Sequence, residues 1–184
     1  LRDDFFDIYI YLKKKGLNIS IFTNATLITE KHVKLFKKYP PRDIEVTVYG
    51  ITKNTYEKVT RNGGGFDAFI QGLNLLLNNN IKVRLKTIAM RSNVNELPQI
   101  TNFSRKKTTD YYRFDPFLKL RFDRDETKNS VIKSEILSPE EICTLEKNDS
   151  ERFKVLKKNE CNIFIMPEFL NNSCNHLFHC GAGN

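Results

Sequence analysis

Segments with strand character alternate with segments of helical periodicity along most of this chain, and this alternation is the feature that most limits its fold. The expected strands are residues 18–23, 44–49, 81–90 and 112–120, with 162–166 as a last candidate. The expected helices are residues 3–15, 29–39, 55–59, 66–78, 96–106 and 138–158. Strands separated by helices at intervals of roughly 30 residues pair in parallel through right-handed crossovers. The fold class is therefore α/β, and an open doubly wound sheet and a (β/α) barrel both fit.

Residues that start or stop helices fix several boundaries. Gly16 follows the first apolar-periodic segment as a C-terminal cap would, and Thr29 precedes the second as an N-cap. Ser138 and Pro139 begin the last helix, with Ser as the cap and Pro at the first helical position. This helix is expected to reach about residue 158, and an interruption near Asp149 stays open.

The carboxyl ends of the strands are the places where an α/β protein binds its ligands, in open sheets and in barrels. The residues at or near those ends are Thr23, Asn24, Thr47, Tyr49, Gly50, Lys86 and Thr87. These residues are the candidate binding residues.

Each of these candidates also has a simpler interpretation. Thr23 and Asn24 can shape a turn by bonding neighbouring backbone groups. Thr47 and Tyr49 are two residues apart and are expected on one face of their strand, opposite Val46 and Val48. The face with Thr47 and Tyr49 points towards a ligand if the sheet closes into a barrel. Otherwise it is a strand face partly in contact with water.

Two further clusters contain residue types that bind phosphate or metal ions in other proteins. The Gly-rich segment 62–66 opens a helix, but it lacks the Lys-Ser/Thr of a phosphate-binding loop and comes after a helix, so a turn is expected. Near the carboxyl end, four possible zinc ligands fall within seven residues, namely Cys174, His176, His179 and Cys180. Paired CxxC spacing is absent from this tail, which argues against a complete zinc site made of these four side chains.

Composition excludes several classes of protein. The chain has 40% hydrophobic and 28% charged residues, which is typical of a globular domain and not of a disordered chain. No apolar run is long enough to cross a membrane. The formal charge of +8 comes largely from lysines in the helical segments, so a hydrated surface is expected and nucleic-acid binding is not. Four cysteines without even spacing favour a reducing compartment, and we expect a cytoplasmic protein.

Several of these motifs, taken in order, resemble a radical S-adenosylmethionine (SAM) enzyme of the SPASM type, a group that includes peptide maturases. Residues 22–27, Phe-Thr-Asn-Ala-Thr-Leu, resemble the family's "TNGTLL" strand end, and residues 46–50 resemble its "iSlDG" strand. Residues 64–66 resemble its "GsF" helix start, and residues 93–97 its polar turn after the next strand. Residues 1–5 resemble the stretch directly after its GGEP motif, and residues 180–183 the first cysteine segment of the SPASM extension.

The resemblance implies a partial TIM-like (β/α) barrel with parallel strands, which binds SAM against a [4Fe-4S] cluster. Reductive cleavage of SAM yields a 5′-deoxyadenosyl radical that abstracts a hydrogen atom from the substrate, here a peptide or protein. The cofactors carry that chemistry, and a reductant such as ferredoxin or flavodoxin supplies the electron.

The resemblance also assigns roles to single residues. Thr47 takes the place of a ribose-facing Ser, and Tyr49 stands where the family has Asp. Ala25 replaces a Gly, and Arg61 lies one residue after the position of an Arg that reaches the methionine carboxylate. Cys180 takes the place of a ligand of an auxiliary cluster.

The resemblance further implies that the chain is truncated at both ends. The family's CxxxCxxC and GGEP segments would precede residue 1, since none of the four cysteines here has that spacing. We expect residues 1–166 to form the partial barrel and residues 167–184 a linker and the start of the extension. This chain alone is expected to be inactive. The alternative is a non-catalytic binding module, with or without zinc in its tail.

Overall fold

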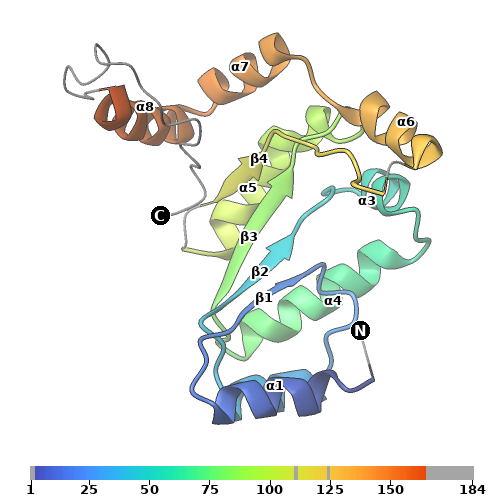
Figure 1. Ribbon diagram of the computed structural model, residues 1–184, viewed down its shortest axis with the longest axis vertical. Coiled ribbons are helices and arrows are strands. Elements are labelled where there is room, and N and C mark those ends of the chain that lie inside the picture. Colours follow the sequence, from blue (N-terminus) through green and yellow to red (C-terminus); the bar gives the residue numbers. More distant parts are fainter. Residues whose placement is uncertain (1–2, 110–111, 124, 165–184) are drawn as a thin grey trace. The chain divides into compact units, whose positions relative to one another are not determined.

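The structure, a computed structural model, describes residues 3–109, 112–123 and 125–164, and the backbone alone for 159–164. It divides into two units, Leu1–Ser138 and Pro139–Asn184, and each is described by itself. The larger unit holds one parallel sheet of four strands in the order β1-β2-β3-β4. Figure 1 shows these strands with the helices that connect them.

The strands of the sheet are β1 (Ser20–Thr23), β2 (Asp43–Thr47), β3 (Val83–Ile88) and β4 (Arg113–Asp115). The helices of this unit are α1 (Phe5–Lys14), α2 (Glu30–Lys38), α3 (Lys53–Thr60), α4 (Gly65–Asn78), the short η1 (Val94–Glu96), α5 (Leu97–Lys107) and α6 (Glu126–Glu135). The predicted alternation of parallel strands and helices is confirmed.

The two faces of the sheet differ in what covers them. Ile44, Val46 and Leu85 point to one face and join a single buried cluster with side chains from α1, α2, α3, α4 and α5. Because strand residues alternate between faces, the residues between them point the other way. Helices on one face indicate the winding of a barrel and not of a doubly wound sheet, so the fold is consistent with a partial TIM-like barrel.

Close backbone packing ties the loop after β1 to this core. Ala25 is fully buried with a positive φ of 63°, a conformation that glycine adopts more easily. A Cβ atom added to Gly72 of α4 would lie 2.0 Å from the Ala25 carbonyl oxygen. Only a glycine at 72 lets α4 approach this loop so closely.

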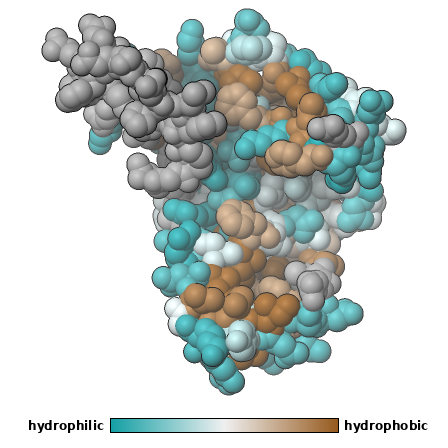
Figure 2. Space-filling view, viewed as in Figure 1, coloured by the Kyte–Doolittle hydropathy of each residue, from teal (hydrophilic) through white to brown (hydrophobic). Residues whose placement is uncertain are grey.

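Exposed apolar residues gather in the part of this unit nearest its amino end. Ile8, Tyr11, Leu17, Phe22 and Leu27 are all more than two-fifths exposed. Figure 2 shows hydrophobic residues (brown) over the region where Figure 1 draws α1 and β1. Phe22, at 67% exposure, is the most exposed of these five and lies on the sheet face that the helices leave open.

Two expectations about strands were wrong, and one helix was missed. The strand at 112–120 is only β4, because Pro116 follows Asp115 and has no N–H for the ladder. Helix α6 was not predicted, although Asp125 caps it by accepting from the Lys128 amide at 3.0 Å. Residues 162–164 of the last strand candidate are helical, since a short apolar run does not distinguish strand from helix.

The smaller unit contains α7 (Pro139–Asn148) and α8 (Ser150–Phe164). They pack together, and Arg152 Nη2 donates to Glu146 Oε1 at 2.7 Å. The break near Asp149 is confirmed.

Candidate functional site

One face of the sheet carries charged side chains on three neighbouring strands, and we call it the polar face. Strand register places Glu45 beside Phe22 and Arg84, and Thr47 beside Lys86. Lys86 in turn lies beside Arg113, and Ile88 beside Asp115. The polar face is Phe22, Asp43, Glu45, Thr47, Arg84, Lys86, Arg113 and Asp115. Within the described part of the larger unit, α1 to α5 pack on the opposite face.

Glu45 is the centre of this charge arrangement. Its Oε1 lies 2.8 Å from Lys86 Nζ, and its Oε2 lies 3.5 Å from Arg113 Nη2. Lys86 Nζ is also 3.8 Å from Asp115 Oδ2 and 5.3 Å from the centre of the Phe22 ring. The side chains of Glu45 and Lys86 are only 10% and 17% exposed. Among the described residues, none donates a hydrogen bond of normal geometry to Glu45 Oε1, so its contact with Lys86 is an ion pair.

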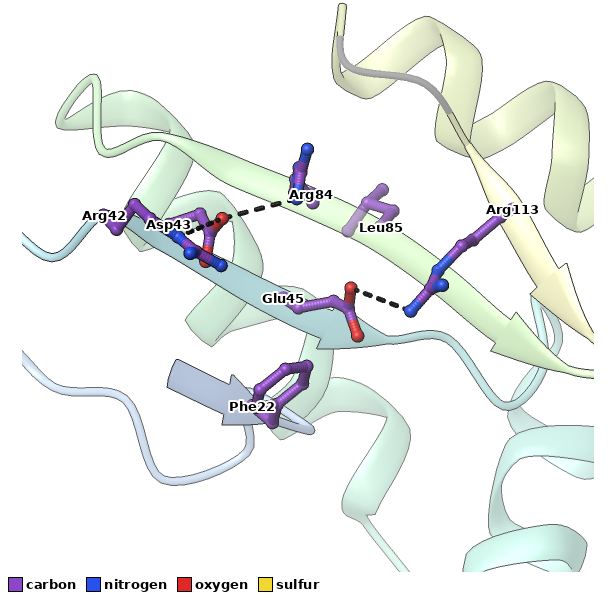
Figure 3. A pocket seen from close by; sticks show the side chains of 7 residues that line it. All are labelled: Phe22, Arg42, Asp43, Glu45, Arg84, Leu85 and Arg113. Carbon is purple, nitrogen blue, oxygen red and sulfur yellow. Dashed lines mark hydrogen bonds and ion pairs between the residues drawn. The ribbon is translucent and has the colours of Figure 1, made fainter. Parts of the chain in front are cut away.

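Asp43 forms a second charged group at the amino end of β2. Its Oδ2 lies 3.3 Å from Arg84 Nη1 and 3.4 Å from Arg42 Nε. A hydrogen bond from Ser20, together with the charges of Arg42 and Arg84, holds the pKa of Asp43 below its ordinary value against the opposing effect of burial. Figure 3 shows Asp43 and Arg84 on the neighbouring strands β2 and β3, with Arg42 directly before β2.

The loop after β1 contains Thr23 and Asn24, and both make local turn contacts. Thr23 Oγ1 accepts from the Ala25 amide at 3.1 Å. Asn24 Oδ1 accepts from the Thr26 amide at 3.2 Å and from its hydroxyl at 2.9 Å. Thr23 and Asn24 therefore shape a turn, which was the simpler of their two interpretations, and their hydrogen bonds fix the loop at the carboxyl end of β1.

The loop after β2 contains Tyr49 and Gly50. Strand β2 ends at Thr47, so strand alternation does not extend to Tyr49, whose ring packs edge-on against Tyr56 at 6.0 Å. Gly50 is required by close packing, since a Cβ atom there would lie 2.7 Å from the Tyr56 amide nitrogen.

Two side chains from the segment after β3 hold this loop. Asn93 Nδ2 donates to the carbonyls of Tyr49 and Ile88 at 3.0 Å each, and its Oδ1 accepts from the Met90 amide at 2.9 Å. The Glu96 carboxylate accepts four hydrogen bonds, from the amides of Ile51 and Thr52 and the hydroxyls of Thr52 and Thr55. Burial would raise the pKa of Glu96, but these hydrogen bonds outweigh it and lower the pKa below its ordinary value.

The structure therefore brings some candidates together and separates others. Thr47 and Lys86 are register neighbours on the polar face. Thr87 points to the other face, where its buried hydroxyl donates to the Val48 carbonyl at 3.0 Å. Arg61 is exposed and ends α3 with a φ of 53°. Cys180 and the other three tail ligands, Cys174, His176 and His179, lie outside the described residues.

Strand ends identified Lys86 but not the other charged residues of the polar face. Glu45, Arg113 and Asp115 were not among the candidates, and neither were Asn93 and Glu96. A signal existed for Glu45, because residues 43–47 read Asp-Ile-Glu-Val-Thr and alternate polar with apolar side chains. Charged residues at every second position of a strand indicate a polar face.

The described residues contain neither a cluster of metal ligands nor a membrane-spanning helix. No group of three His, Cys, Asp or Glu side chains suited to a metal ion occurs among them. Cys143, in α7, is an exposed free thiol. No helix in this part of the chain is long and apolar enough to span a membrane.

Comparison with known proteins identifies the family. A model of the radical SAM superfamily matches residues 1–103, just over half of the 184 residues. A curated relative, named Fe-coproporphyrin III synthase, from Methanosarcina barkeri (strain Fusaro / DSM 804), is 32% identical over 100 residues. The matched part covers 54% of this chain and 25% of the relative, so the chain spans about a quarter of that protein's length. With its parallel α/β fold, the chain belongs to the radical SAM superfamily.

Proposed function

We propose that this chain forms the SAM-binding part of a longer radical SAM enzyme of the SPASM type. The observation that carries the proposal is the pairing of Thr47 and Lys86 on the open face of a parallel sheet in a member of this superfamily. With its cofactors bound, such an enzyme cleaves SAM reductively at a [4Fe-4S] cluster and removes a hydrogen atom from its substrate. The residues of this chain would bind and orient SAM and exclude water from it.

The polar face has the chemistry that SAM requires. SAM carries a carboxylate, an ammonium group, a sulfonium and ribose hydroxyls, so its site needs charges of both signs and hydrogen-bonding groups. Lys86 is suited to the carboxylate and the Thr47 hydroxyl to the ribose, while Glu45 and Asp115 supply negative charge beside them. Asn93 and Glu96 hold the Tyr49–Thr52 loop at the carboxyl end of β2. We propose that this loop, with Thr23, Asn24 and Gly50, borders the bound cofactor.

The described residues do not fit the iron–sulfur cluster. Three thiolates are needed to hold a [4Fe-4S] cluster that also binds SAM. Among the residues whose side chains the structure describes, Cys143 is the single cysteine. None of the four cysteines of the sequence has CxxxCxxC spacing. We propose that another part of a longer protein supplies these ligands, that Cys180 belongs to an auxiliary cluster, and that this chain alone does not cleave SAM. The boundary between barrel and extension would lie near residue 166.

SAM binding and SAM cleavage test this function separately. Isothermal titration of SAM into the 184-residue chain is expected to show binding that Thr47→Val and Lys86→Met each weaken by about tenfold, the loss of one charge-assisted contact. Lys34→Met, on the exposed side of α2, is the matched control and is expected to leave affinity unchanged. After anaerobic reconstitution with iron and sulfide, the chain should release no 5′-deoxyadenosine. An unchanged affinity in Lys86→Met and Thr47→Val would contradict the proposed site.

Two substrate classes are consistent with this function. SPASM enzymes modify peptides or proteins, which makes a peptide the first candidate. The name of the Methanosarcina barkeri relative indicates a second candidate, a tetrapyrrole. In either case the partner that supplies the electron would be a low-potential protein such as ferredoxin or flavodoxin, in the cytoplasm.

A further inference from the structure

A cavity lies on the polar face next to the proposed SAM site. It has a volume of about 300 Å³ and is lined by Phe22, Arg42, Asp43, Glu45, Arg84, Leu85 and Arg113. None of these residues was a candidate from the sequence. Figure 3 shows that they come from β1, from β2 and the residue before it, and from β3 and β4. This volume is at the lower end of the range for small-molecule sites, so it suits one edge of a larger ligand.

The charges around the cavity are arranged by depth. The side chains of Asp43 and Glu45 are each only 10% exposed. Those of Arg42, Arg84 and Arg113 are 65%, 48% and 49% exposed. A ligand therefore meets three guanidinium groups at the rim, held in place by two carboxylates beneath them. A guanidinium fixed by a buried carboxylate loses little entropy when it binds a second anion.

Arg42 and Arg113 have N–H groups beyond those that their described ion pairs engage. A guanidinium has five N–H donors in a planar fork that matches a carboxylate. The contact of Arg113 with Glu45 engages Nη2, and that of Arg42 with Asp43 engages Nε. The three guanidinium groups and two carboxylates of the cavity lining sum to one positive charge. Lys86 and Asp115 lie beside the cavity, 3.8 Å from each other, and their opposite charges leave this sum unchanged.

Phe22 adds a second, independent feature. The Phe22 ring is 67% exposed beside charged groups, and it forms one wall of the cavity. Lys86 Nζ lies over one face of the ring, 5.3 Å from its centre, and this contact limits the movement of the ring. Such a ring offers a stacking surface for a flat conjugated molecule.

We propose that this cavity binds the substrate of the enzyme, and that the substrate is a flat conjugated molecule with carboxylate side chains. The carboxylates would bind Arg113, Arg84 and Arg42, and the ring system would lie on Phe22. This inference rests on the proposed function. Glu45 is two residues before Thr47 on β2, a distance of about 7 Å along the strand, so a substrate here lies beside the SAM site.

A flat carboxylate fits these features better than a peptide. A peptide in extended form binds a sheet mainly through its backbone at an exposed edge. The cavity lies instead over the face of β2 and β3, which are inner strands of the sheet. The groups that it offers to a ligand are guanidinium groups, which bind carboxylates, and one aromatic ring, which stacks on a planar molecule.

Coproporphyrin III, which has four carboxylates on a flat ring, is the probe for the test. It is titrated into the full 184-residue chain in 0.15 M salt, with the shift of its main absorption band and its fluorescence as readouts. We expect saturable binding that Arg113→Gln weakens about tenfold and Phe22→Ala about fivefold, as expected for a charge-assisted hydrogen bond and a stacking contact. Arg113→Lys is expected to recover only part of the affinity, because Lys lacks the planar fork.

Matched controls separate a specific site from general porphyrin adsorption. Arg121→Gln removes an exposed arginine that pairs with Asp123 away from the cavity, and it should leave the affinity unchanged. A porphyrin with four N-methylpyridinium groups has the same flat ring with positive charges and should not bind at the cavity. Circular dichroism and thermal unfolding confirm that each variant is folded.

Two results would overturn the proposal: equal coproporphyrin affinity in the wild type, Arg113→Gln and Phe22→Ala, or saturable binding of an acidic peptide with coproporphyrin excluded. The SAM titration distinguishes this failure from failure of the proposed function. If SAM binds and coproporphyrin does not, the substrate class is wrong and the radical SAM function stands.

Discussion

The Glu96 carboxylate accepts a hydrogen bond from the Ile51 amide at 2.8 Å, although the two residues are 45 positions apart in the sequence. Three further hydrogen bonds from Thr52 and Thr55 converge on the same carboxylate, at distances from 2.6 to 3.3 Å. Glu96 therefore joins the segment after β3 to the loop after β2 and the first turn of α3. The loop in question holds Tyr49 and Gly50, so the geometry of the proposed SAM site depends on Glu96.

Glu96→Gln is expected to lower the free energy of unfolding by about 1.5–3 kcal/mol at pH 7, the range for a hydrogen bond to a charged group. An amide cannot accept four donors as a carboxylate does, because its nitrogen is itself a donor. Urea unfolding measures the loss, and faster hydrogen exchange at the Ile51 and Thr52 amides locates it. Glu57→Gln is the control, because Glu57 accepts one exposed hydrogen bond from the Gly64 amide.

The same bonds make the contribution of Glu96 pH-dependent. Its pKa in the folded chain lies below the ordinary value, so the stabilisation is complete above the unfolded pKa of about 4.3 and is lost as the pH falls through the folded value. The stability difference between wild type and Glu96→Gln should shrink as the pH is lowered below about 4. A difference that stays constant from pH 7 to pH 3 would contradict this account.

Gly72→Ala is expected to destabilise the chain by about 1–3 kcal/mol, because the new methyl group would overlap the Ala25 carbonyl. The higher helix propensity of alanine, about 1 kcal/mol, offsets part of this loss. Gly63→Ala is the matched control, since a Cβ atom there meets nothing within 4 Å. Thermal unfolding of both variants measures the effect. Equal melting temperatures would show that α4 does not pack closely on this loop.

Local sequence signals predicted the elements that carry strong periodicity. Residues 66–78 repeat apolar side chains at helical spacing, and the structure has α4 at Gly65–Asn78. Helix α6 was missed because it has no buried residue, so no apolar face marked it. Strand β4 was predicted too long because apolar residues continue past Pro116, where the ladder of backbone hydrogen bonds cannot.

Only those residues of the candidate site that lie at the end of a strand could be predicted from the sequence. The rule for strand ends located Thr47 and Lys86, which the register then placed side by side. The contacts of Glu96 with Ile51, of Asn93 with Tyr49 and of Asp43 with Arg84 each span more than 40 residues, so no local pattern reveals them. Which cation Glu45 contacts is likewise fixed by strand register.

Asn93→Asp should destabilise the chain by about 2–4 kcal/mol at pH 7. Asn93 is almost fully buried, and its amide nitrogen donates to the Tyr49 and Ile88 carbonyls. A carboxylate there would face two carbonyl oxygens without a proton to donate, which costs the desolvation of each group. Burial would raise the pKa of the new Asp, so stability should recover in part as the pH falls towards 5. Urea unfolding at several pH values measures this, and a pH-independent loss would argue against the predicted repulsion.

The buried pair of Glu45 and Lys86 allows a test of coupling on the polar face. Glu45→Leu is expected to cost about 3–5 kcal/mol, because it leaves Lys86, which is 17% exposed, with Asp115 alone at 3.8 Å. Lys86→Met should cost less, since Glu45 keeps Arg113 at 3.5 Å. Removing both charges together avoids an unpaired buried charge, so the double variant should be more stable than the sum of the single losses predicts.

Urea unfolding of the four proteins in this cycle gives the coupling free energy, which we expect to be about 1–3 kcal/mol for residues in contact. Arg121→Gln with Asp123→Asn is the matched cycle at an exposed pair and should give a clearly smaller coupling, because water screens these charges. Additive losses for Glu45→Leu and Lys86→Met would mean that the 2.8 Å contact contributes nothing to stability. The polar face would then be held by the strands alone, and its charges would be available to ligands without a cost to the fold.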